Sequence, residues 1–319
     1  MSTALVPTFG AVLIGDMISA GLYGLTTLQV YLYFQKCWNT DPPRLKAFIF
    51  WVWLLETVHI FLISAFIFRS LVIEFGDPAA LTVTRVSDDV TTAITGLIIF
   101  SVHMFYTRRL WILSEGSRYR VPLTLTVVLL AITHFGLEIA VMLLTFKFPL
   151  FADFHRITAA YTGSLGVAAG CDLIIAIAMW YFLHSRRSGL KSTNAMVNRI
   201  ITFVIMTGSL TSVVDIATLI SFVVMPNNLV YLSMYNLVNN LYANSLLAMI
   251  NARETLGKMP IGGDTSFALS DFRASDNTAT NPPRGLNGQT SSDLSKMSFA
   301  PYKGVSCTDT FGSAVTSAV

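Results

Sequence analysis

The sequence predicts an all-α fold: a polytopic membrane protein built as a bundle of seven transmembrane helices, with its N-terminus outside and its C-terminus in the cytosol. The first observation is composition, because 53% of the 319 residues are apolar, only 12% are charged, and the mean hydropathy is +0.61. A soluble domain carries about 25% charged residues, so these values indicate a chain that lies mostly in lipid. The other two observations are the long apolar segments and the uneven placement of Lys and Arg between them.

Seven segments are long enough to cross a bilayer, for which about 20 apolar residues suffice. The first basic residue is Lys36, so the first segment lacks the positively charged start of a cleaved signal peptide and is expected to remain as a helix. The last two segments are joined only by the letters MPNN, which predicts a tight helical hairpin. In chain order the segments are residues 10–34, 47–72, 90–112, 121–146, 157–183, 199–225 and 228–250.

The end of the chain has a different composition. Residues 254–319 hold 18 Ser or Thr among 66, with scattered Gly, Asn and Pro and no helical period. Such a composition is typical of a disordered segment. We therefore expect a transmembrane domain over residues 1–253 and a disordered, Ser/Thr-rich cytosolic tail over residues 254–319.

Lys and Arg are concentrated on one side of the predicted helices. The first, third and fifth connections and the tail carry 17 of the 21 basic residues, and the remaining four are Arg69, Arg85, Lys147 and Arg156. Because basic loops stay in the cytosol, this pattern places the tail inside and the N-terminus outside, which requires an odd number of helices. The largest outer loop, residues 73–89, is mildly acidic through Glu74, Asp77, Asp88 and Asp89.

Ionisable side chains at membrane depth are the informative residues, because each costs about 2.5–3.5 kcal/mol on insertion scales. No Lys or Arg lies near the centre of a segment, whereas several carboxylates, histidines and asparagines do. Together they predict a polar interior that opens outward. The candidate ligand-binding or cavity-lining residues are Asp16, Glu56, His59, His134, Glu138, Asp172, Asp215, Asn240 and Asn244.

Helical spacing places several polar residues on common faces. His134 and Glu138 are four residues apart and close enough to pair, and Glu56 and His59 share a face of the second segment. The alternative role of such faces is structural, because interhelical hydrogen bonds contribute about 0.6 kcal/mol each on average. Two longer polar stripes occur, one of Asn236, Asn240 and Asn244 and one of Thr211, Asp215 and Thr218. A separate face of small residues, Gly163, Gly166 and Gly170, predicts close helix packing.

The sequence lacks the residues that several known functions of membrane proteins and enzymes require. The last segment has no lysine for a retinal Schiff base, and the chain has no nucleophile elbow, P-loop, dinucleotide fingerprint or nucleic-acid-binding module. A zinc site could draw on His59, His103 and His134, but their spacing matches no zinc motif. We therefore expect no cofactor, no metal, no nucleic-acid partner and no enzymatic activity.

Six strings in the chain are similar to a known family of membrane proteins. They are LYGLTTLQVYLYF (22–34), WLLETVH (53–59), TRRLWILS (107–114), RRSGLKST (186–193), TGSLTS (207–212) and YANSLLAMINAR (242–253). Through them the chain resembles, from about residue 15 to 254, a family of fungal integral membrane proteins known as domain of unknown function 6534. The resemblance implies a seven-helix membrane region with a variable tail, and it implies no reaction, ligand or cofactor. Its motif positions here include Glu56, His59, Asn244 and Arg253.

These observations favour a receptor-like sensor of a small or lipidic ligand, located in the plasma membrane rather than an internal membrane. The polar interior would bind the ligand, and the basic inner loops and the tail would contact a cytosolic partner. The alternative is a proton-coupled transporter that uses Glu138, Asp172 and Asp215. A third hypothesis is a metal-dependent enzyme embedded in the membrane.

Overall fold

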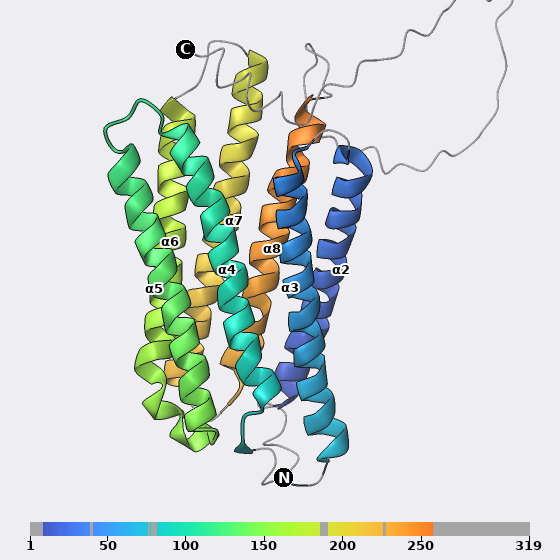
Figure 1. Ribbon diagram of the computed structural model, residues 1–319. Coiled ribbons are helices and arrows are strands. Elements are labelled where there is room, and N and C mark those ends of the chain that lie inside the picture. Colours follow the sequence, from blue (N-terminus) through green and yellow to red (C-terminus); the bar gives the residue numbers. More distant parts are fainter. Residues whose placement is uncertain are drawn as a thin grey trace, which may run out of the picture.

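The computed structural model describes residues 9–38, 41–75, 77, 82–185, 191–225 and 228–257, and of residues 152, 191–207 and 252–257 it describes the backbone alone. The described chain folds into long helices that run side by side in one bundle (Figure 1). No strand occurs among the described residues, so the predicted all-α fold is confirmed. The long helices are α2 (Ala11–Cys37), α3 (Pro43–Phe68), α4 (Val86–Leu113), α5 (Arg120–Lys147), α6 (Thr158–Ser185), α7 (Lys191–Val224) and α8 (Val230–Gly257). Two short elements lie between them, the π-helical turn η2 (Arg69–Ile73) after α3 and the 3-10 helix η4 (Phe151–Arg156) before α6.

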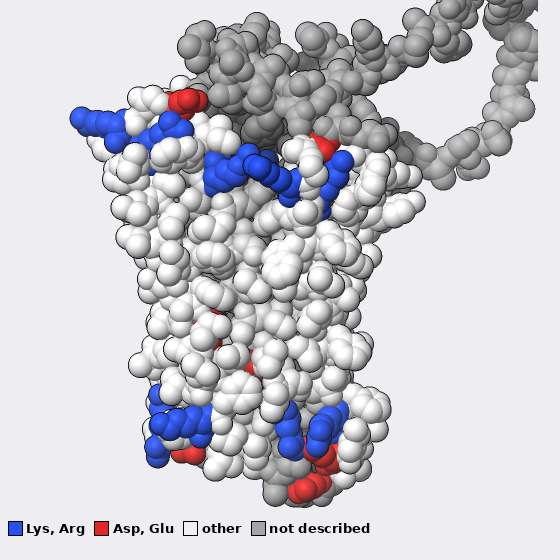
Figure 2. All heavy atoms as spheres, in the orientation of Figure 1, with Lys and Arg blue, Asp and Glu red and all other residues white. Residues whose placement is uncertain are grey.

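Five of these helices are long and apolar enough to cross a membrane: α2, α3 with η2, α4, α5 and α6. In α7 the apolar stretch found among the described residues is shorter, Gly208–Val224. Figure 2 shows the corresponding surface, in which Lys and Arg gather at the two ends and the belt between them carries almost no charge. The chain is therefore an integral membrane protein, while the number of spans and the orientation remain predictions.

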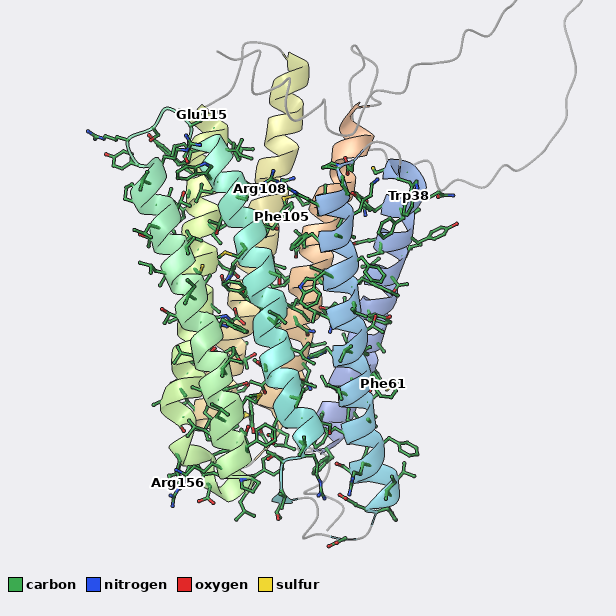
Figure 3. All side chains as sticks on the ribbon, in the orientation of Figure 1. Trp38, Phe61, Phe105, Arg108, Glu115 and Arg156 are labelled. Carbon is green, nitrogen blue, oxygen red and sulfur yellow. The ribbon has the colours of Figure 1, made fainter. Side chains whose placement is uncertain are left out.

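The two ends of the bundle are named here after Figure 1. At the lower end α2 begins, and η2, η4 and the connection from α7 to α8 lie there. At the upper end lie residues 114–119, which join α4 to α5, and the last turns of α2, α6 and α8. Arg108 and Glu115 lie toward the upper end and Arg156 lies at the lower end (Figure 3). Residues 258–319, most of the predicted tail, lie outside the described residues, and α8 continues past the predicted boundary to Gly257.

Local sequence accounts for where several helices begin and turn. Pro42 is extended and Pro43 opens α3, a position at which proline loses no helical hydrogen bond. Gly116 adopts a φ of +79° in the tight connection between α4 and α5, a conformation that only glycine adopts without strain.

The predicted outer loop 73–89 is shorter in the structure, because α4 begins at Val86 rather than at residue 90. Asp88 and Asp89 lie in its first turn and are buried. A carboxylate in the first turn is stabilised by the positive end of the helix dipole. Two adjacent aspartates interrupt the apolar pattern, and for that reason the sequence predicted a loop there.

The core is divided by depth into two apolar clusters with a polar layer between them. The cluster toward the upper end includes Tyr33, Leu110 and Met179, and the cluster toward the lower end includes Ile63, Leu165 and Phe222. α8 is central, since it contacts α2, α3, α4 and α7. Buried polar residues of α3 to α8 lie between the clusters, among them Glu56, His59, Thr95, His134, Glu138, Asp215, Asn236, Asn239 and Asn240.

Close helix approach occurs at other glycines than predicted. A Cβ on Gly15 would collide with Ser233 of α8, and a Cβ on Gly96 of α4 would lie 2.7 Å from Cβ of Glu138 in α5. A Cβ on Gly166 or Gly170 would meet no atom within 4 Å, and one on Gly163 only a leucine methyl at 3.7 Å. The predicted small-residue packing face of α6 is therefore wrong, because these glycines do not lie where α6 packs tightly against its neighbours.

Candidate functional site

Asp172 lies in the middle of α6 and is held by three other helices. Nε2 of His103 (α4) lies 3.0 Å from its Oδ1, while Thr211 Oγ1 (α7) and the Tyr242 hydroxyl (α8) donate to its Oδ2 at 2.5 and 2.6 Å. Asp172 is 6% exposed and His103 is fully buried. An imidazole and two hydroxyls thus replace the water that would otherwise solvate this carboxyl group. We call these four residues the Asp172 cage.

Glu138 of α5 has a matching set of partners. Ser164 Oγ (α6) donates to its Oε1 at 2.5 Å and the Tyr235 hydroxyl (α8) to its Oε2 at 2.7 Å. Nε2 of His134 lies 3.4 Å from Oε1, which confirms that the pair spaced by four residues meets on one face of the helix. Glu138 and His134 are each 1% exposed. We call these four residues the Glu138 cage.

The two cages are joined through α8 and through their histidines. Tyr235 and Tyr242 are seven residues apart, so they lie on one face of α8, two turns from each other. The rings of His103 and His134 contact edge to face, with centroids 6.2 Å apart, and His103 also meets the ring of Tyr242 at 5.7 Å. One continuous buried set of titratable groups therefore extends from Glu138 to Asp172.

Asp215 adds a third carboxyl group between the cages. It lies on α7 one turn beyond Thr211, is 1% exposed, and neither of its oxygens makes a hydrogen bond within the described residues. The Tyr242 hydroxyl faces it, and it lies close enough to Asp172 and Glu138 for their charges to interact. We call the two cages together with Asp215 the central network.

A small cavity of about 20 Å³ adjoins the central network, with room for about one water molecule. Asp172, Thr211 and Tyr242 line it, together with Tyr106, Ile175, Ala176, Gly208 and Ser245. Most of these other residues lie nearer the upper end than Asp172 does. The sequence predicted an interior that opens toward the N-terminal side, but this cavity lies on the opposite side of Asp172.

Four of the nine predicted site residues belong to the central network: His134, Glu138, Asp172 and Asp215. The other five lie outside it, on α2, α3 and the opposite face of α8. Asp16 is half-buried and accepts weak hydrogen bonds from Ser64 at 3.3 and 3.4 Å.

Glu56 and His59 are fully buried on α3, but the structure records no ion pair between them. Glu56 accepts a hydrogen bond from Asn239 at 3.3 Å, and both ring nitrogens of His59 lack a partner within the described residues.

The asparagines of α8 donate mainly to backbone oxygens. Asn240 Nδ2 donates to the backbone oxygen of Asn236 at 3.2 Å, and Asn244 Nδ2 donates to those of Leu22 in α2 and Asn240 at 3.0 and 2.9 Å. The bond from Asn244 to Leu22 fixes α8 against α2, as the structural alternative proposed, and the other two lie within α8. Arg253, a motif position of the resemblance, has no described side chain.

Five of the nine residues of the central network were not among the candidate site residues: His103, Thr211, Ser164, Tyr235 and Tyr242. His103 was considered only for a zinc site and Thr211 only as part of a polar stripe, while tyrosines in an apolar helix look like core residues. The seven-residue spacing of the two tyrosines was the one signal that could have indicated them. Among the described residues, no group of three or more His, Cys, Asp and Glu is arranged to hold a metal ion.

A separate ion-pair cluster closes the lower end. Glu74 accepts hydrogen bonds from Arg69 Nε at 2.8 Å and from Arg85 Nη2 at 2.5 Å. The hydrogen bond from Arg69, with further help from Arg85, holds the pKa of Glu74 below its usual value. Because Arg85 directly precedes α4, this cluster connects the end of η2 to the start of α4.

Comparisons with known proteins find one similarity. No curated protein and no solved structure matches the chain. A family of unknown function, DUF6534, matches residues 168–255, which run from the middle of α6 through α7 to the last turn of α8. This stretch holds Asp172, Thr211, Asp215, Tyr235 and Tyr242, so over the α6–α8 part of its central network the chain is similar to the family of unknown function DUF6534.

Proposed function

We propose that this membrane protein binds protons and moves them across the membrane, with the central network as its proton-binding site. The observation that carries the proposal is the pair of linked cages: two buried carboxyl groups, each with its own histidine, whose imidazole rings contact each other. Histidine changes its charge within the physiological pH range, and an ionisable residue inside the membrane is a functional candidate by default.

The arrangement of the carboxyl groups supports a shared proton in this network. Asp215 lies within electrostatic reach of both Asp172 and Glu138 in a buried region. Three carboxyl groups and two histidines thus lie together in one buried region. The two histidines and the tyrosine hydroxyls give such a proton several positions, at the atoms whose hydrogen bonds are described above.

The size of the cavity favours this function over the receptor-like sensor. About 20 Å³ holds about one water molecule, whereas pockets for organic ligands typically measure about 300–1,000 Å³. Water and protons are therefore the ligands that fit this site as it stands. The receptor-like sensor, the cytosolic partner, the plasma-membrane location and the outside N-terminus remain predictions, as does the membrane-embedded metal enzyme.

Infrared difference spectroscopy of the purified full chain in liposomes tests the proposal. A pH titration should change the absorbance of protonated carboxyl groups, and Asp172→Asn and Glu138→Gln should each remove part of that change. Glu56→Gln makes the same chemical change at a buried carboxyl outside the network and serves as the control. A wild-type carboxyl signal that does not change with pH, or one that both network variants keep in full, would refute the proposal.

A flux assay tests whether the protein moves protons across a membrane. Liposomes containing the protein and a trapped pH-sensitive dye should acidify faster than empty liposomes when a potassium diffusion potential drives protons inward. Asp172→Asn should reduce the rate toward that of empty liposomes. Protonation that depends on pH without any proton flux would instead favour a proton sensor, a function that the same network could serve.

A further inference from the structure

The polar face of α4 continues beyond the central network to the lower end of the bundle. Asp88, Thr95 and His103 are separated by seven and eight residues, so they lie along one helix face. All three are buried, at 7%, 0% and 0% exposure. Asp88 lies in the first turn of α4, His103 belongs to the Asp172 cage, and the Thr95 hydroxyl faces Tyr235 of the Glu138 cage.

A group of tyrosines lies alongside this face. The ring of Tyr161 (α6) lies 5.6 Å from that of Tyr235 and 6.0 Å from that of Tyr231, both on α8. Tyr235 donates to Glu138 at 2.7 Å. Tyr161 and Tyr231 both lie within electrostatic reach of Asp88. The tyrosines therefore span the depth between Asp88 at the lower end and Glu138 in the middle.

Several polar atoms along this line are buried without a hydrogen-bond partner among the described residues. They are Oδ1 of Asp88, Oγ1 of Thr95, the hydroxyl of Tyr161 and both carboxylate oxygens of Asp215. A buried polar group without a partner is costly, and buried water usually satisfies such groups in proteins. Contacts on the same tyrosines link these groups, since Thr95 and Tyr161 both meet Tyr235, and Tyr161 lies within electrostatic reach of Asp88 and Asp215.

We propose that Asp88, Thr95 and Tyr161 form an access route along which protons reach Glu138 from the lower end. The inference rests on the proposed function and specifies which side supplies Glu138. Asp88 exchanges a proton with the aqueous phase, and the hydroxyls of Tyr161, Thr95 and Tyr235, with bridging water, pass it inward. The cavity beside Asp172 lies on the other side of the network, so the two carboxyl groups face opposite ends of the bundle.

Other titratable groups surround the route and share its protons. From α4 they are Asp89, next to Asp88, and His103. The remaining groups are His134 on α5, Asp172 on α6, Asp215 on α7, and Tyr231 and Tyr235 on α8. The test therefore measures rates, which depend on the route, separately from equilibrium protonation, which depends on all of these groups together.

The test compares Tyr161→Phe and Asp88→Asn with wild-type protein in liposomes. Both variants should slow proton flux by about tenfold, which corresponds to a barrier higher by about 1.4 kcal/mol. Both should keep the equilibrium carboxyl signal of Glu138 in infrared spectra. Tyr23→Phe is the matched control, because the Tyr23 hydroxyl bonds to Thr57 at 2.9 Å between α2 and α3, away from the route, and its flux should not change.

The outcomes separate the two proposals. Wild-type flux in Tyr161→Phe and Asp88→Asn, with a normal Glu138 signal, would overturn the route and leave the proposed function standing. A wild-type protein without any pH-dependent carboxyl signal would overturn both. Thr95→Val replaces a hydroxyl by a methyl group of the same shape, so it repeats the test on α4 should Asp88→Asn fail to fold, and an unchanged flux there would count equally against the route.

Discussion

Gly96 is the position at which packing and the central network are most directly coupled. Its Cα faces Glu138, and a Cβ added there would lie 2.7 Å from Cβ and 2.8 Å from Cγ of Glu138, and 3.5 Å from Cδ2 of Phe135. Separations below 3.0 Å force atoms to move. The atoms in conflict belong to the base of the Glu138 side chain, so a change of rotamer cannot relieve the contact, and α4 and α5 must separate locally.

Gly96→Ala should therefore destabilise the protein and disturb the Glu138 cage at the same time. Overpacking of this kind costs about 1–3 kcal/mol. Replacing glycine by alanine in a helix interior also stabilises the helix by about 0.8–1.0 kcal/mol. The cost of the clash therefore has to be measured against a second Gly→Ala substitution that has the same gain in helix propensity but no clash. Gly136→Ala on α5 is that control, because a Cβ there meets no atom within 4 Å. The difference in unfolding free energy between the two variants should be about 1–3 kcal/mol.

The assay is equilibrium unfolding in mixed micelles, followed by circular dichroism as the denaturing detergent is increased. Infrared spectra of the same samples report the carboxyl band of Glu138, which should shift in Gly96→Ala and stay in place in Gly136→Ala. Equal midpoints for the two variants would refute the proposed close contact between α4 and α5. A lower midpoint with an unshifted carboxyl band would show that the contact between Gly96 and Glu138 stabilises the packing of α4 on α5 but does not position the Glu138 side chain.

Three further predictions concern single polar side chains. Tyr242→Phe removes a donor 2.6 Å from Asp172 and should lower the free energy of unfolding by about 1 kcal/mol, the usual contribution of one hydrogen bond; a free energy of unfolding equal to that of the wild-type protein would contradict this bond. Asn244→Ala should cost about 1 kcal/mol through its two backbone bonds and leave proton flux intact, whereas lost flux with unchanged stability would return a ligand-binding role to this residue. Glu74→Gln should lower the melting temperature slightly at neutral pH and leave it unchanged in acid, since a carboxyl group with a lowered pKa stabilises the fold above its unfolded pKa and loses that contribution as pH falls through its folded pKa. Equal effects of Glu74→Gln at both pH values would contradict the ion pairs with Arg69 and Arg85.

The helices could be predicted because each is a local pattern. A stretch of about 20 apolar residues is visible without knowledge of its neighbours, and the predicted segments agree with the described helices to within a few residues at most ends. The start of α4 was placed four residues late, at residue 90 instead of Val86. Asp88 and Asp89 caused this error, since charge at the end of an apolar run resembles a loop unless the residues that bury it are known.

The candidate site could be predicted only as far as a single helix reaches. His134 and Glu138 meet because a helix brings every fourth residue to one face, and that pair was visible in the sequence. The contact of Asp172 with His103 joins residues 69 positions apart, and that with Tyr242 joins residues 70 apart. Such contacts depend on which helices become neighbours, and the hydropathy of a segment carries no information on that choice.

Hydrogen bonding alone does not explain why the central network lies in the membrane. The two cages make five hydrogen bonds to their carboxyl groups, three at Asp172 and two at Glu138. At about 0.6 kcal/mol each, five such bonds contribute about 3 kcal/mol, whereas inserting two carboxyl groups costs about 5–7 kcal/mol. A bundle held together by the apolar clusters above and below would be more stable with apolar residues in this layer. The deficit is small enough for a fold to tolerate, and it is the physical reason to look for a proton in the network rather than for a structural role.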